Sequence, residues 1–197
     1  IAAVGPCTLQ PDPDAFLVLV RSVVAQLIST RAAASIFARL RAGLDGDAVT
    51  PAAVLAAGEA TLRSAGLSGA KARTMLDLAE RAVSGALPLG RLPDLTDDEV
   101  IAHLLPVRGI GTWTAQMFLI FSLGRLDVLP LGDFGLRAGV QQQYGLPALP
   151  GGRELLERAE PWRPYRAVAT WYFWRSRGFV PQSGLGSAAP PGAARGR

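Results

Sequence analysis

The sequence predicts an all-α fold, and three observations support this prediction. Apolar residues recur at three- and four-residue spacing through most of the chain, as they do on the buried face of a helix. Several segments open with residues that favour helix starts, and none shows the two-residue alternation of a half-buried strand. At 197 residues, 49% of them hydrophobic, the chain can bury a substantial core. We therefore expect one compact helical unit with two lobes, spanning residues 1–182.

Four helices are predicted in the N-terminal part of the chain. The first runs from Asp14 to Ser29, and its apolar residues share one face: Phe16, Leu19, Val20, Val23, Val24 and Leu27. The second covers residues 32–41. The third starts at Thr50, with a proline in its first turn. The fourth starts at Ser68 and ends near Val83, because serine is a favourable N-cap.

The helical pattern continues toward the C-terminus. Residues 96–99, Thr-Asp-Asp-Glu, have the form of a capping box before a helix over residues 100–105. Residues 113–121 are apolar on nearly all sides, which predicts a buried helix. An extended linker over residues 127–130 and then Gly132-Asp133 precede a helix predicted over Phe134–Tyr144. A last helix, rich in aromatic residues, is predicted over residues 162–175.

Composition excludes several kinds of site. Cys7 is the only cysteine and His103 the only histidine. This excludes an intrachain disulfide, a cysteine-rich metal or iron–sulfur site, and a histidine-based zinc site. We interpret His103 as an ordinary helix residue near the end of its helix.

The N-terminal residues show no basic region followed by an apolar run, so we expect no secretory leader. No stretch is long enough to span a bilayer. We therefore expect an intracellular, cytoplasmic protein without a membrane partner. The C-terminal residues 183–197 contain almost no bulky apolar side chain, which predicts a flexible tail.

The charge balance is modestly basic, with a net charge of +4 and an isoelectric point near 10.0. Such a balance favours salt-dependent attraction to a nucleic acid. It is equally typical of an ordinary protein surface, so it does not identify a partner by itself.

The stretch Arg108-Gly109-Ile110-Gly111-Thr112 predicts a tight turn between two helices. Two glycines allow backbone conformations that a Cβ atom would penalise, and Thr112 is placed to cap the apolar helix that follows. Such a helix-hairpin-helix leaves backbone N–H groups at the start of its second helix, where the helix dipole favours a bound anion. It can hold a DNA phosphate without reading sequence. The alternative is a helix–helix turn without a ligand.

A longer pattern surrounds this hairpin. Residues 104–137 read L-L-x-x-R-G-I-G-x-W-T-A-x-M-F-L-I-F-x-L-G-R-x-D-V-x-P-x-G-D-x-G-L-R. The pattern closely resembles the DNA-3-methyladenine glycosylase II family, which comprises alkylated-base glycosylases of the helix-hairpin-helix superfamily. The resemblance extends over roughly residues 14–175. It implies the two-lobed helical glycosylase fold in its compact form, without the β-rich N-terminal domain of some members.

The resemblance implies an activity and a partner. Members of the family remove alkylated bases such as 3-methyladenine and 7-methylguanine from double-stranded DNA, which initiates base excision repair. We therefore expect a DNA glycosylase that acts as a monomer. No cofactor is expected to be required, although a structural monovalent cation at the hairpin is implied, held by the backbone carbonyls of Leu105, Val107 and Ile110.

Individual residues match functional positions of the family. Asp133 matches the catalytic aspartate, and on its own it is also a favourable helix N-cap; the two roles are compatible. Trp113 and Trp171 match positions of the base pocket, although aromatic residues at helical spacing are also common in cores. Met117 stands where some relatives carry an aromatic ring, so we expect it in the same pocket.

The DNA-binding residues are also implied by the resemblance. They comprise one residue of the first helix and five of the hairpin: Leu27, Arg108, Gly109, Ile110, Gly111 and Thr112. The leucine that Leu27 matches fills the gap left when a nucleotide leaves the duplex. Because Leu27 also continues the apolar face of its predicted helix, an ordinary core position is the alternative.

The expected chemistry is glycosidic hydrolysis without strand cleavage. A lyase needs an amine to form a Schiff base, and lyase members of the superfamily carry that lysine at the position of Trp113. Lys71 is the only lysine in the chain. The base must leave the stack before its bond is accessible, and the Asp133 carboxylate can then stabilise positive charge on the sugar. Two alternatives remain: a non-enzymatic DNA-binding module, and a glycosylase for deaminated or oxidised bases.

Overall fold

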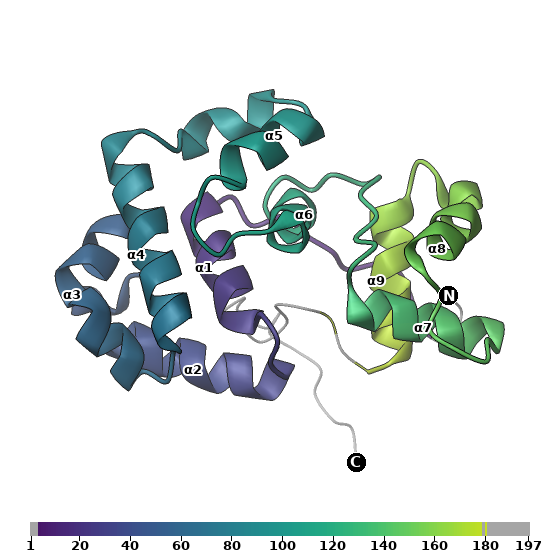
Figure 1. Ribbon diagram of the computed structural model, residues 1–197, viewed down its shortest axis with the longest axis horizontal. Helices are drawn as coiled ribbons and strands as arrows, with labels where there is room; N and C mark the ends of the chain where they lie inside the picture. Colours follow the sequence, from purple (N-terminus) through teal and green to yellow (C-terminus); the bar gives the residue numbers. More distant parts are fainter. Residues whose placement is uncertain (1–3, 179, 181–197) are drawn as a thin grey trace, which may run out of the picture.

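The computed structural model describes residues 4–178 and 180. Over these residues it contains helices and no strand, which confirms the all-α prediction (Figure 1). The α-helices are α1 (Ala15–Ala25), α2 (Thr30–Ala42), α3 (Pro51–Ser64), α4 (Gly69–Ser84), α5 (Asp97–Leu104), α6 (Thr112–Phe121), α7 (Phe134–Tyr144), α8 (Gly152–Ala159) and α9 (Arg166–Ser176). Short 3₁₀ helices are η1 (Asp45–Asp47), η2 (Leu89–Asp94) and η3 (Glu160–Trp162).

The helices form two lobes, as predicted. Helices α1 to α6 lie together in the first lobe, and α7 to α9 lie together in the second (Figure 1). The larger apolar cluster fills the first lobe and also includes residues of α9, among them Trp171 and Trp174. The second and smaller cluster is built from residues of the linker, α7 and α8: Leu129, Leu136, Val140, Leu155 and Ala159.

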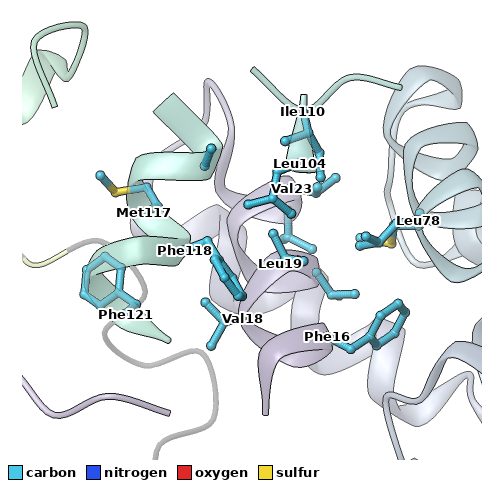
Figure 2. Close-up of a cluster of buried hydrophobic side chains, with 14 of the residues drawn as sticks. Phe16, Val18, Leu19, Val23, Leu78, Leu104, Ile110, Met117, Phe118 and Phe121 are labelled. Atoms are coloured by element: carbon cyan, nitrogen blue, oxygen red, sulfur yellow. The ribbon is translucent and has the colours of Figure 1, made fainter. Parts of the chain in front are cut away.

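Helix α1 is the centre of the first lobe. It contacts α2, α4 and α6, and most of its residues are buried, including Leu19 and Val23. Figure 2 shows Phe118 of α6 beside Val18 and Leu19 of α1. Burial of each apolar side chain of this size stabilises the fold by about 1.5–3 kcal/mol. Helix α1 therefore forms a rigid base for the segments at its two ends.

The predicted helix starts are largely confirmed by their caps. The hydroxyl oxygens of Thr50 and Ser68 accept hydrogen bonds from backbone N–H groups of α3 and α4. Thr96 and Glu99 form the reciprocal capping box at the start of α5. Helix α7 covers Phe134–Tyr144 as predicted, and Asp133 caps it.

Several predicted boundaries were wrong. Helix α1 ends at Ala25 rather than Ser29, because the chain turns at Leu27, which has a left-handed φ of 57°. Gly111 is the N-cap of α6, and Thr112 is the first helical residue rather than the cap. The last helix starts at Arg166 rather than at residue 162, since Pro164 cannot lie within a regular helix. Helix α8 was not predicted.

Two contacts fix the segment that joins the lobes. Asp127, in the linker after α6, accepts hydrogen bonds from the Arg166 guanidinium at the start of α9, the shortest being 2.6 Å from Nε. The Ala167 N–H donates to the Leu126 carbonyl at 2.8 Å. Since α9 also contacts α7, this linker sets the position of the second lobe. The predicted end of the core at residue 182 and the predicted tail over 183–197 lie outside the described residues.

Candidate active site

A cavity of about 720 Å³ opens between the two lobes. Its wall comes from three segments: the turn from α1 into α2, the start of α6, and the start of α7 with the two residues before it. The second of these segments follows the hairpin directly. A cavity of this volume lies in the range of small-molecule sites, so it is large enough for one nucleobase.

Asp133 lies in the wall of this cavity and is only 6% exposed. Its Oδ1 accepts hydrogen bonds from the Leu136 N–H at 2.6 Å and from the Trp174 indole Nε1 at 2.8 Å. Its Oδ2 accepts one from the Trp113 indole Nε1 at 2.9 Å. Three N–H donors therefore fix the carboxylate at the N-terminus of α7, where the helix dipole favours a negative charge.

The charge of Asp133 is stabilised by these dipoles rather than by a counterion. Among the described residues, none of the ion pairs includes Asp133. A buried carboxylate held by neutral donors retains a field that favours positive charge nearby. The site can thus stabilise a cation that develops in the cavity.

Trp113, for which the resemblance implied a base-pocket position, lines the cavity and is half-buried. Phe134, which was not predicted, also lines it and is 64% exposed. Its signal in the sequence is its position directly after Asp133, as the first residue of α7. Together the two rings add aromatic surface to the cavity wall near Asp133.

Trp171 and Met117 are placed differently from the prediction. Neither is among the residues that line the cavity, and both are buried in the core of the first lobe. Met117 leaves α6 on the same side as Phe121, away from Phe118 (Figure 2). Met117 lies one helical turn after Trp113. At that level this side of α6 is covered by other core residues, so Met117 does not reach the cavity wall.

Trp174 replaces Trp171 as the tryptophan of α9 that reaches the site. It is not among the pocket positions that the resemblance implied. It is fully buried, stacks on Phe121 with ring centroids 5.8 Å apart, and donates to Asp133. The ring of Trp171 instead meets Tyr172 edge-on at 5.0 Å. Trp174 is therefore a functional residue that sequence reasoning missed.

The turn from α1 into α2 presents Leu27 at the mouth of the cavity. Leu27 is fully exposed and lines the cavity, so the alternative of a core position was wrong. Its neighbours Gln26 and Ile28 line the cavity as well. A large apolar side chain left in solvent on a left-handed residue is costly on both counts, which indicates a functional position.

The hairpin turn between α5 and α6 has the backbone features that its glycines predict. Gly109 is left-handed with a φ of 71°, and the Arg108 N–H donates to the Asp77 carboxylate at 2.7 Å. Gly111 and Thr112 are exposed, and no side chain among the described residues caps α6. Its first N–H groups therefore remain available for an anion.

Ile110 differs from the other hairpin residues. Its side chain is buried and belongs to the main core, and its N–H donates to the Val107 carbonyl at 3.1 Å. Both groups are thus used within the protein. Ile110 anchors the turn, and the predicted DNA contacts are left to the exposed residues around it.

The carbonyls predicted to hold a monovalent cation belong to the same turn. Leu105 is largely exposed and Val107 is buried, and the Val107 carbonyl already accepts the Ile110 N–H. A carbonyl oxygen has a second lone pair, and oxygen donors suit hard cations, so the donor set fits such an ion. No cluster of three or more His, Cys, Asp or Glu side chains that could hold a metal occurs in the described part of the chain.

Comparison with known proteins places this geometry in a family. The family model described as the HhH-GPD superfamily base excision DNA repair protein matches residues 20–164. The chain belongs to the HhH-GPD superfamily. The matched region starts within α1 and ends before α9, so it includes all three segments of the cavity wall and the hairpin.

Individual HhH-GPD relatives are similar over most of their length. DNA-3-methyladenine glycosylase 1 of Schizosaccharomyces pombe is 34% identical over 160 residues, which cover 80% of this chain and 70% of the relative. The alkylbase DNA glycosidase-like protein mag2 of the same organism is 29% identical over 180 residues, covering 89% and 84%. The solved structure of the S. pombe 3-methyladenine DNA glycosylase Mag1 in complex with abasic DNA superposes with a TM-score of 0.83 at 30% identity, covering 91% of this chain and 89% of that one.

Within the described residues, no helix is both long and apolar enough to cross a bilayer.

Proposed function

We propose that this protein is a monofunctional DNA glycosylase that removes alkylated bases, such as 3-methyladenine and 7-methylguanine, from double-stranded DNA. The observation that carries the proposal is Asp133, a buried carboxylate without a counterion among the described residues, in the wall of a base-sized cavity beside the hairpin. The similarity to proteins named as alkylbase and 3-methyladenine glycosylases supports it. A DNA-binding module without activity would need neither the cavity nor the buried charge.

The residues around the cavity divide the reaction between them. The exposed hairpin residues Arg108, Gly109, Gly111 and Thr112 hold a DNA phosphate near the N-terminus of α6. The damaged nucleotide rotates out of the duplex, and Leu27 fills the gap that it leaves. Alkylation at a ring nitrogen makes the base cationic, and a cation is attracted to the faces of aromatic rings such as Trp113.

Bond cleavage follows from the position of Asp133. As the bond between C1′ and the base nitrogen breaks, its electrons leave with the base and positive charge builds on the deoxyribose. The carboxylate stabilises that charge and orients the water that attacks C1′. The attacking water releases one proton to the solvent, the cationic base leaves as a neutral molecule, and the other product is an abasic site. A monovalent cation held by the carbonyls of Leu105, Val107 and Ile110 would add positive charge beside the phosphate, and no other cofactor is required.

The direct test is base release from alkylated duplex DNA, with the released bases identified by chromatography. The wild-type protein should release alkylated purines, and Asp133→Asn should reduce single-turnover release by about a hundredfold or more. Asparagine can still cap α7 through its amide oxygen, so the affinity for an abasic-site analogue should be retained. Its amide nitrogen would face an indole N–H, so a modest fall in melting temperature is expected. Unchanged release by the variant would remove Asp133 from the mechanism.

A matched control is available in the same chain. Asp14 caps α1 in the same way, accepting the Leu17 N–H at 2.9 Å, and it does not line the cavity between the lobes. Asp14→Asn should leave base release unchanged. We further propose that the protein acts as a monomer inside the cell, where its DNA substrate is; sedimentation of the free and DNA-bound protein tests the stoichiometry.

A further inference from the structure

The turn that carries Leu27 is a strained element that requires support. Leu27 adopts a φ of 57° and its side chain lies in solvent. A left-handed backbone is unfavourable for a residue with a Cβ atom, and such conformations persist only where surrounding contacts enforce them. The side chain of Leu27 supplies none of these contacts. The support must come from its neighbours in the turn.

Lys71 of α4 supplies two of those contacts. Its ammonium Nζ donates hydrogen bonds to the carbonyls of Val24 at 2.8 Å and Gln26 at 2.7 Å. These carbonyls lie at the C-terminal end of α1, where the last carbonyls lack helical partners and the helix dipole favours a positive charge. Partial burial lowers the pKa of Lys71 from its ordinary value by desolvation, in line with its partly exposed position.

Gln26 joins the same turn to the hairpin. Its side-chain Nε2 donates to the Gly109 carbonyl at 3.1 Å and to the Thr114 hydroxyl oxygen at 2.9 Å. The carbonyl of Gln26 is therefore held by Lys71. Its side chain is held by Gly109 of the hairpin turn and by Thr114 in the first turn of α6. The position of Leu27, one residue later, is fixed relative to the hairpin.

One face of α4 supports both DNA-facing turns. Lys71, Thr74 and Asp77 are spaced three residues apart and so lie on the same side of the helix. Thr74 packs against Gly109, and Asp77 accepts the N–H of Arg108. Helix α4 thus holds the Leu27 turn through Lys71, and it holds the hairpin through Thr74 and Asp77.

We propose that Lys71 is a positioning residue, which locks the Gln26-Leu27-Ile28 turn so that Leu27 is presented to DNA in register with the hairpin. This inference rests on the proposed function only in taking Leu27 as the residue that enters the duplex. It differs from the simpler interpretation of Lys71 as a solvated or phosphate-binding cation, because two of its three N–H groups are already used by the protein. It also predicts that the effect of Lys71 depends on Leu27.

The test is a double-mutant cycle between Lys71→Met and Leu27→Ala in the full chain. The probe is a duplex that contains a tetrahydrofuran abasic-site analogue with 2-aminopurine beside it, whose fluorescence reports on stacking at the gap. Lys71→Met keeps the side-chain length but removes the donors. The turn then samples other conformations, and the fraction of molecules whose turn is in the DNA-binding conformation falls. Apparent affinity should fall by about tenfold, and the fluorescence change at saturation should fall toward that of Leu27→Ala.

Coupling between the two positions decides the outcome. In the Leu27→Ala background, Lys71→Met should cause little further loss of affinity or fluorescence change. A loss that is equally large in both backgrounds would show that Lys71 acts independently of Leu27, and wild-type behaviour of Lys71→Met would show that it does not act at all. Either result overturns the proposal. If Lys71→Met does not fold, Lys71→Ala takes its place in the same cycle, because alanine also removes both hydrogen bonds and is favourable in a helix.

Arg73→Met is the matched control for charge. Arg73 also lies on α4, and within the described residues its only ion pair is a 3.7 Å contact with Glu59 between two exposed side chains. The losses of binding free energy caused by Arg73→Met and by Leu27→Ala should be additive. The readouts need no base excision, so failure of the wild-type protein to release bases would refute the proposed function without altering this test.

Discussion

The Trp174 indole Nε1 donates a hydrogen bond of 2.8 Å to Oδ1 of Asp133, across the interface between α9 and the start of α7. The same ring stacks on Phe121 of α6. One tryptophan therefore connects the core of the first lobe to the carboxylate of the second. Trp113 approaches the other oxygen of Asp133 from the hairpin side, so the orientation of the carboxylate depends on both lobes.

Substitution of Trp174 by phenylalanine should impair base release more than it impairs DNA binding. The change keeps an aromatic ring against Phe121 but removes the donor to Asp133. Loss of a hydrogen bond to a charged group costs about 1.5–3 kcal/mol, which corresponds to about ten- to a hundredfold in rate if it is lost in the transition state. Single-turnover release at saturating protein, beside affinity for an abasic-site analogue, separates the two effects.

Trp162→Phe is the control for this substitution. Trp162 lies against Phe173 with ring centroids 5.0 Å apart and packs on the second, smaller cluster. It makes no hydrogen bond to Asp133, so its substitution should leave the release rate unchanged. Equal losses in both variants would mean that the rate responds to packing of the second lobe rather than to the bond.

The two glycines of the hairpin should respond differently to alanine. A Cβ atom on Gly109 would collide with the Thr74 side chain, and the φ of 71° disfavours any residue with a Cβ atom. We expect Gly109→Ala to lower the free energy of unfolding by about 2 kcal/mol, which is a loss of about 4–8 °C in melting temperature for a chain of this size.

Gly111→Ala is the partner experiment. Gly111 has an ordinary φ of −109°, and no atom lies within contact distance of a Cβ atom placed there. The melting temperature should therefore be retained, whereas affinity for DNA should fall because the new methyl group obstructs a phosphate at the start of α6. Full affinity of this variant would be incompatible with a phosphate site at that helix terminus.

The fold was predictable because local and global signals agree in this sequence. Helix α7 begins and ends where its N-cap residue Asp133 and its following Gly145 predict, and the Thr96–Glu99 capping box marks α5. Such signals are local, so a single sequence carries them. The 720 Å³ cavity was not predictable, because residues 25–33 form it together with residues 111–114 and 132–135, which are distant from them in sequence.

The aromatic-rich helix shows where sequence reasoning failed. Helix α9 carries large apolar or aromatic residues on several sides, so periodicity does not reveal which ring points at α7. Resemblance favoured Trp171, whereas the structure directs Trp174 to Asp133. Trp171 and Trp174 are three residues apart and point to different sides of α9. Which side faces Asp133 is set by the packing of α9 on α7 and not by the residues of α9 themselves.

The Leu27 turn shows a second limit. Spacing from Val23 and Val24 made Leu27 look like one more apolar residue of α1. The chain leaves the helix because Lys71 and the hairpin hold the turn residue Gln26. Those partners are between 45 and 88 residues away in sequence, so no local pattern could indicate them.

Acid should weaken the junction between the lobes through Asp127. The hydrogen bond from the Arg166 guanidinium is the main cause that holds the pKa of Asp127 below its ordinary value. A carboxylate with a lowered folded-state pKa stabilises the fold above its unfolded pKa of about 3.9. That contribution is lost as the pH falls from there through the folded-state pKa.

Comparison with Asp127→Asn measures this contribution. At neutral pH the variant should be less stable by about 1 kcal/mol, a modest value because the side chain is 30% exposed and exposed ion pairs are screened. The stability difference should shrink as the pH falls below about 4, since the wild-type carboxylate becomes neutral and the asparagine does not titrate. Denaturant unfolding from pH 6 to pH 2.5, taken as the difference between the two proteins, tests it; a difference independent of pH would contradict the assignment.

The protein should release bases without cleaving the strand, because no lysine is placed to attack the sugar. A lyase forms a Schiff base between an amine and C1′. Lys71, the only lysine of the chain, does not line the cavity, and its ammonium is bound to two carbonyls of the turn at the end of α1. Tryptophan occupies position 113 in the cavity wall and has no nucleophilic amine.

Borohydride should therefore trap no covalent complex with DNA that contains an abasic site, and the product strand should break only after alkali or heat. A trapped adduct that maps to Lys71 would require the turn at the end of α1 to open during turnover, and it would overturn both the monofunctional assignment and the positioning role of that lysine.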